Sequence, residues 1–110
     1  MKQIGIWVIS FVCMVGMNTA RAEEGEAIFK AQGCMSCHKK ESTSKVNPSL
    51  TEISMAYQGK AAQLSKYLKG ESEAIVRPEK ASLMKRYIEK TKKLSDADRK
   101  ALTDYLLHQQ

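Results

Sequence analysis

The sequence is poor in the large apolar and aromatic residues that build a core. Phe, Trp and Tyr make up 6% of the 110 residues, and the single Trp lies at position 7. The alternation of apolar and polar residues that is typical of strands occurs nowhere in the chain. There is also no internal repeat, low-complexity tract or second domain. The sequence therefore predicts one small all-α domain, whose thin core needs help from a metal or a cross-link.

The one long apolar run lies at the N-terminus. Residues 4–17 are mostly apolar, Lys2 precedes them, and the sequence Ala20-Arg21-Ala22 follows them. This pattern is typical of a secretory signal peptide with an A-x-A cleavage site, and the run is shorter than the ~20 residues that span a bilayer. We expect residues 1–22 to be removed and residues 23–110 to form the domain, in the periplasm and without stable membrane insertion. An uncleaved anchor is the alternative.

Groups for enzyme chemistry are scarce as well. The chain has 3 cysteines, of which Cys13 lies in the N-terminal run, and 2 histidines. No pair of a nucleophile and a base stands out, and no pair of carboxylates does. We therefore expect no enzymatic activity. Export and a modest positive charge argue against a nucleic-acid partner.

The remaining two cysteines and one histidine stand together in the sequence Gly33-Cys-Met-Ser-Cys-His38. A C-x-x-C core serves redox dithiols, zinc sites and, when His follows, haem attachment. A dithiol would need a βαβ setting, and a zinc site would need two further ligands. In haem attachment, Cys34 and Cys37 form thioethers to the vinyl groups, and His38 is carried under the ring to bind iron. A haem would also add a large apolar plate to a thin core, which favours this interpretation.

Apolar residues at helical spacing predict a series of short helices after the cleavage site. Helices are expected over residues 23–32, 50–58, 60–69 and about 78–90, with glycines 33, 59 and 70 ending the first three. Ser95 is expected to cap the last helix, whose buried stripe comprises Ala101, Leu102, Tyr105 and Leu106. Residues 39–49, which include Pro48, are polar and are expected to form a loop.

The whole domain resembles the class I c-type cytochromes. The resemblance rests on GEAIFKAQGCMSCH, on Asn-Pro-Ser-Leu after the attachment motif, on YLKGESEAIVRPEK, and on LSDADRKALTDYLL. Within that class, the chain is most similar to the short soluble monohaem cytochromes of sulfur- and hydrogen-oxidising thermophilic bacteria. The resemblance implies the cytochrome c fold, in which short helices wrap around one covalently attached haem c.

The resemblance also assigns roles to particular residues. It implies that Cys34 and Cys37 bind the haem vinyls, that His38 is the proximal iron ligand, and that the Pro48 carbonyl accepts the imidazole N–H. Asn47 replaces the glycine that usually precedes this proline, and Asn tolerates a left-handed backbone. Gly25, Phe29 and Tyr105 match the positions at which the first and last helices of the family cross.

The sixth iron ligand is expected to be Met84. A thioether is a soft ligand that raises the potential of haem iron. Met35 lies inside the attachment motif and cannot reach the opposite face of the ring, and Met55 is expected to pack in the core on its helix. Met84 follows His38 by 46 residues, far enough to pass around the ring edge. Lys85 stands where many relatives have proline, and the rival ligand His108 is expected to be a solvated residue near the C-terminus.

These assignments favour a periplasmic one-electron carrier that acts as a monomer between respiratory or sulfur-oxidising redox partners. Lys39, Lys40, Lys45, Lys85 and Arg86 flank the attachment motif or Met84, so the partner is expected to present an acidic surface. An ordinary solvated lysine surface is the alternative. Other functions that stay open are an electron-transfer subunit of a sulfur-compound oxidising complex, a five-coordinate haem that binds gas or peroxide, and a haem-free dithiol oxidoreductase.

Overall fold

A computed structural model describes residues 16–109, with side chains from residue 23 onward. Five α-helices and two 3₁₀-helices follow one another, and no strand occurs within these described residues. The elements are α1 (Gly16–Ala31), η1 (Cys34–Ser36), α2 (Leu50–Ala56), α3 (Ala61–Leu68), η2 (Pro78–Met84), α4 (Lys85–Thr91) and α5 (Asp96–Leu107). The prediction of an all-α fold is confirmed.

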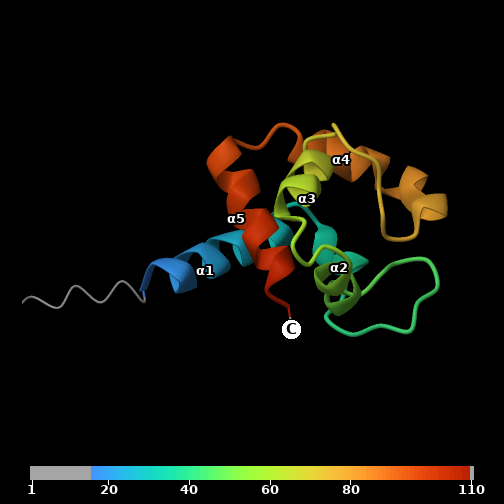
Figure 1. Ribbon diagram of the computed structural model, residues 1–110, viewed down its shortest axis with the longest axis horizontal. Helices are drawn as coiled ribbons and strands as arrows, with labels where there is room; N and C mark the ends of the chain where they lie inside the picture. Colours follow the sequence, from blue (N-terminus) through green and yellow to red (C-terminus); the bar gives the residue numbers. More distant parts are fainter. Residues whose placement is uncertain (1–15, 110) are drawn as a thin grey trace, which may run out of the picture.

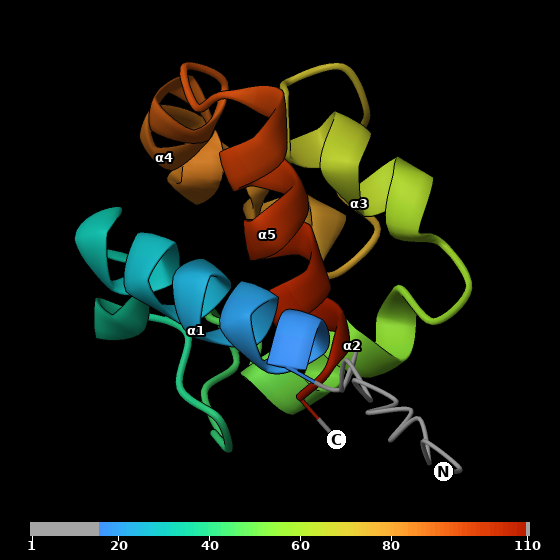
Figure 2. The same ribbon diagram turned by 90° about the vertical axis from the view of Figure 1, so that its left-hand side faces the viewer.

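Helices α1 and α5 cross in close contact, as Figures 1 and 2 show. The crossing is close because Gly25 has no side chain: a Cβ built there would lie 2.2 Å from the Ala101 carbonyl oxygen. One turn further along α1, the Phe29 ring packs against the Tyr105 ring with centroids 5.5 Å apart. The crossing therefore fixes α1, which leads into the attachment motif, against the C-terminal helix.

The core is small and joins four of the helices. Phe29 of α1, Leu64 of α3 and Leu102 of α5 are almost fully buried, and Tyr57, which follows α2, lies among them. Ser54 of α2 is 0% exposed, and its hydroxyl donates to the Leu107 carbonyl oxygen over 2.7 Å. This bond ties α2 to the end of α5, where backbone carbonyls lack helical partners.

The helix ends follow local sequence signals. Ser95 caps α5 by accepting a hydrogen bond from the Asp98 backbone N–H, as predicted, and Ser49 caps α2 in the same way through Glu52. Gly33 ends the first helical segment in a left-handed conformation, with φ of 78°. The predicted helix over residues 78–90 is two elements, the 3₁₀-helix η2 and the α-helix α4.

The N-terminal prediction concerns a region that is mostly outside the described residues. Residues 1–15 lie there, and α1 begins at Gly16 rather than at the expected Glu23, so it runs through the proposed cleavage site after Ala22. Cleavage itself stays a prediction. Among the residues from 16 to 109, no helix is long and apolar enough to cross a membrane.

Candidate haem-binding site

The attachment motif forms a tight turn directly after α1. The Cys37 and His38 backbone N–H groups both donate to the Cys34 carbonyl oxygen, over 3.2 and 2.9 Å. This turn brings the half-buried side chains of Cys34 and Cys37 and the imidazole to one cavity. In the chain without a cofactor, burial raises the pKa of the Cys34 thiol, and the nearby Lys90 ammonium offsets part of that rise. Before any bond to a cofactor forms, the Cys34 side chain is therefore a neutral thiol at pH 7.

His38 is held in one orientation and one tautomer. The ring is 7% exposed, and its Nδ1 lies 2.8 Å from the Pro48 carbonyl oxygen. Because a carbonyl oxygen can only accept, Nδ1 carries the hydrogen, and in the neutral ring Nε2 presents a lone pair. That lone pair faces the Met84 Sδ atom, which lies 3.5 Å away and is also an electron-pair donor. Both atoms are donors of types that bind metal ions. They would have to separate by about 0.8 Å to accept an ion between them, since metal–nitrogen and metal–sulfur bonds are about 2.0 and 2.3 Å long.

Met84 reaches this position because it ends η2, and both Met84 and the attachment motif line the cavity. The two other methionines among residues 23–109 do not line the cavity: Met35 is 47% exposed and Met55 is 62% exposed. The expectation that Met55 packs in the core is wrong, since it projects from the outer face of α2. His108 is exposed, as expected, and its Nδ1 bonds to the Asp104 carbonyl oxygen.

The cavity between these groups has a volume of about 380 Å³ and mainly apolar walls. Its apolar and aromatic lining includes Phe29, Ile53, Tyr57, Leu64, Tyr67, Leu68, Leu102 and Leu106. Burial raises the pKa of the Tyr57 and Tyr67 hydroxyls. Arg77, Lys80 and Arg86 also line the cavity, whereas no carboxylate of the described residues does.

This lining suits haem in three respects. Apolar walls match the porphyrin faces, and cationic side chains match its two propionates. The pairing of an imidazole nitrogen with a thioether sulfur is a known donor set for haem iron. The donor set does not suit zinc, since no cluster of three or more His, Cys, Asp or Glu side chains that could hold a metal ion occurs among residues 23–109.

Comparison with known proteins agrees with this chemistry. The family model described as cytochrome c matches residues 22–110. The chain belongs to the cytochrome c family. It is also similar to a cytochrome c-551 from Stutzerimonas stutzeri, with 32% identity over 81 residues that cover 71% of this chain and 77% of the relative.

Membership of the cytochrome c family settles three of the predictions made from sequence. The fold is the cytochrome c fold, the cofactor is covalently attached haem c, and the protein transfers electrons rather than acting as an enzyme. The Cys34 and Cys37 pair lies in the haem-binding position of the family. Redox proteins are the expected class of partner.

Sequence reasoning missed several contributors to the site, among them Arg77, Lys80 and Tyr67. Arg77 lines the cavity although the sequence offers only an Arg-Pro step as a signal, and Tyr67 lines it although its spacing indicates only a buried helix face. Conversely, Lys39, Lys40 and Lys45 do not line the cavity. Of the five basic residues considered from sequence, only Arg86 does.

Proposed function

We propose that this cytochrome is a periplasmic one-electron carrier with a six-coordinate haem. Cys34 and Cys37 would hold the haem through thioethers, and His38 and Met84 would be the axial ligands of its iron. The observation that carries this assignment is the pair of facing donors, His38 Nε2 and Met84 Sδ, which lie 3.5 Å apart in the lining of one cavity. When bound, the haem supplies an iron that gains and loses one electron.

The Pro48 carbonyl, the Met84 sulfur and the apolar cavity walls would each affect the one-electron exchange at the iron. The Pro48 carbonyl fixes the His38 ring and makes its Nε2 more basic, which strengthens binding to the iron. The Met84 sulfur, as a soft ligand, favours the reduced state and raises the potential. The apolar walls limit the access of water, which also favours the less charged form of the site. With both axial positions filled, no position is left for a substrate.

The partners and the setting are further parts of the proposal. Among the cations beside Met84, Lys85 is exposed and Arg86 lies at the cavity, so a partner with an acidic surface would be attracted to this side. Such attraction weakens as salt screens it. We place the carrier as a monomer among respiratory or sulfur-oxidising partners, in the group of short cytochromes from sulfur- and hydrogen-oxidising thermophiles that the sequence resembles.

Replacement of Met84 by alanine tests the ligand assignment. In protein matured by c-type assembly machinery, Met84→Ala should keep its haem, because the thioethers do not depend on the sixth ligand. Its reduction potential should fall, and the reduced protein should bind carbon monoxide readily, whereas the parent should bind it poorly. Met55→Ala is the matched control, because Met55 is exposed and does not line the cavity. An unchanged potential in Met84→Ala, or a lowered one in Met55→Ala, would contradict the assignment.

A further inference from the structure

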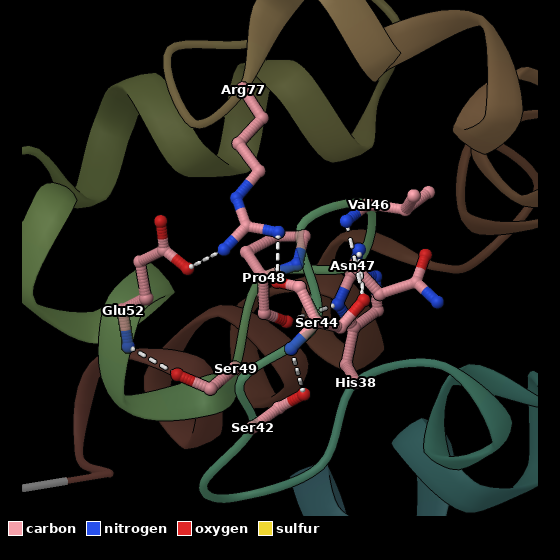
Figure 3. A network of polar contacts seen from close by, with 9 residues as sticks. All are labelled: His38, Ser42, Ser44, Val46, Asn47, Pro48, Ser49, Glu52 and Arg77. Atoms are coloured by element: carbon pink, nitrogen blue, oxygen red, sulfur yellow. Dashed lines mark hydrogen bonds and ion pairs between the residues drawn. The ribbon is translucent and has the colours of Figure 1, made fainter.

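The Arg77 side chain joins three segments that are far apart in sequence. Its Nη1 donates to the Ser44 carbonyl oxygen over 2.6 Å, and its Nη2 lies 2.8 Å from Glu52 Oε2. Ser44 lies in the loop over residues 39–49, Glu52 lies on α2, and Arg77 directly precedes η2. Figure 3 shows the guanidinium between the Glu52 carboxylate and this loop, close to Pro48. We call this set of contacts the Arg77 clamp.

The clamp holds both ends of the segment that presents Pro48. On one side, the Ser44 hydroxyl accepts from the Val46 and Asn47 backbone N–H groups, which makes a compact turn before the proline. On the other side, Ser49 caps α2 through the Glu52 N–H. The Pro48 carbonyl lies between these two anchored points and accepts the hydrogen of His38 Nδ1. Movement of either end would therefore move the acceptor that orients His38.

The same residue starts the segment that carries Met84. Arg77 has φ of 49° and is the only non-glycine with positive φ among residues 16–109. The left-handed region is unfavourable for an arginine, and such strain persists only where surrounding contacts hold it. Pro78 follows as the first residue of η2, and the Arg77 carbonyl accepts from the Lys80 N–H. The direction of η2, and therefore the position of Met84 at its end, depends on the backbone conformation of Arg77.

We propose that Arg77 is a positioning residue for both axial side chains, acting through Pro48 on His38 and through η2 on Met84. The inference rests on the proposed ligation by His38 and Met84. A planar, always charged guanidinium suits the task, because it can bond to a carbonyl oxygen and a carboxylate at once. Half-burial between the loop and the cavity strengthens these bonds relative to an exposed ion pair.

Cyanide binding to the oxidised, haem-loaded protein measures the effect, because cyanide enters only when the sulfur leaves the iron. Arg77→Asn removes the guanidinium, while asparagine tolerates the left-handed backbone. Its cyanide-binding rate should rise about tenfold over the parent, as loss of a charge-assisted pair of bonds predicts. The reduction potential and the absorption band of Met-ligated ferric haem should decrease together. Arg77→Lys, which keeps the charge, and Glu52→Ala, which removes the partner, should give smaller changes of the same sign.

Two controls separate positioning from general stability and from charge. Ser54→Ala removes a buried hydrogen bond on the same helix as Glu52, outside the cavity lining, so it lowers stability without touching the clamp. Lys69→Gln removes one positive charge and the exposed pair with Glu71. Both controls should keep the parent's cyanide rate within about twofold, because the Ser54 hydroxyl bonds to Leu107 and the Lys69 ammonium pairs with Glu71, outside the loop and η2.

The outcomes distinguish this inference from the ligand assignment. If Met84→Ala, measured in parallel, keeps the band of the parent, the ligation itself is wrong. If Met84→Ala loses the band while Arg77→Asn and Glu52→Ala match the two controls, the positioning role is refuted and the ligation stands. Should Arg77→Asn fail to accumulate as a folded protein, Glu52→Ala and Arg77→Lys decide the matter by the same criterion.

Discussion

Replacement of Gly25 by alanine is expected to strain the crossing of α1 and α5, whereas a Cβ added at Gly33, Gly59 or Gly70 would meet no atom closer than 3.6 Å. A Cβ at position 25 would lie 2.2 Å from the Ala101 carbonyl oxygen and 2.6 Å from the Tyr105 Cβ. Ordinary carbon contacts begin at about 3.5 Å, so the two helices would have to separate by roughly 1 Å. Both obstacles are rigid parts of α5, so no flexible side chain can yield.

The magnitude follows from opposing terms. Overpacking in a close contact costs about 1–3 kcal/mol, occasionally more, and separation of the helices also loosens the contact between Phe29 and Tyr105. The better helix propensity of alanine offsets about 1 kcal/mol of this loss in the free energy of unfolding. We expect a net loss of about 2 kcal/mol in the free energy of unfolding, or about 10 °C in Tm for a domain of this size.

Denaturant and thermal unfolding of the haem-loaded protein measure this loss. Gly59→Ala is the matched control, because a Cβ there meets nothing within 4 Å and only the positive φ of 70° is strained. That strain costs about 1 kcal/mol. If Gly25→Ala proves as stable as the parent, or loses less than Gly59→Ala, the close crossing described above is incorrect.

Three further predictions concern stability. Burial raises the pKa of Tyr67 above its ordinary 10.0, so the folded state favours the protonated hydroxyl. The resulting contribution to the free energy of unfolding is complete below pH 10 and is lost as the pH rises through the pKa of the folded state. Tyr67→Phe should therefore flatten the fall of the unfolding free energy with pH in that range, and an unchanged slope would count against the shift. Met55→Ala should cost less than about 1 kcal/mol in urea unfolding because the side chain is mostly exposed, and a loss typical of a core methionine would contradict its placement. The double variant Cys34→Ala, Cys37→Ala should lose most of its helical circular dichroism, since haem binding contributes folding free energy, and full helicity without haem would refute that.

Local signals in the sequence predicted most of the helices. The last helix was predicted because Ser95 is a cap and an apolar stripe follows at helical spacing, and the structure confirms both. Periodicity could not separate η2 from α4, since 3₁₀ and α turns place apolar residues at nearly the same spacing over so short a segment. It also could not show that α1 begins at Gly16, because the apolar run before it was interpreted as a targeting signal.

Local sequence patterns could not predict contacts between segments that are far apart in the sequence. Arg77 bonds to a residue 33 positions away, and nothing near it in the sequence indicates that partner. Arg77 meets this acceptor only once the chain has folded, because a backbone carbonyl carries no sequence signature. Likewise, no pattern in the sequence indicated that Arg99 is buried; it is 4% exposed and donates to the Leu94 carbonyl oxygen over 2.8 Å and to Asp96.

Much of the candidate site could be predicted from the sequence, because the chemistry of haem attachment requires particular residues close together. Covalent attachment demands two thiols and an imidazole in one short stretch, so Cys34, Cys37 and His38 form a local motif. The sixth ligand has no such constraint and was chosen by its distance along the chain and by resemblance. The structure brings Met84 to within 3.5 Å of His38 Nε2, while Met55 projects away from the cavity.

A crystal structure of the matured, haem-loaded protein, with iron located by its anomalous scattering, tests the central claim most directly. We predict one haem joined by thioethers to Cys34 and Cys37, with iron between His38 Nε2 and Met84 Sδ. We also predict that the Pro48 carbonyl still accepts from His38 Nδ1. Iron bound on its sixth side by Met55, His108 or water, or a haem without thioether bonds, would contradict it.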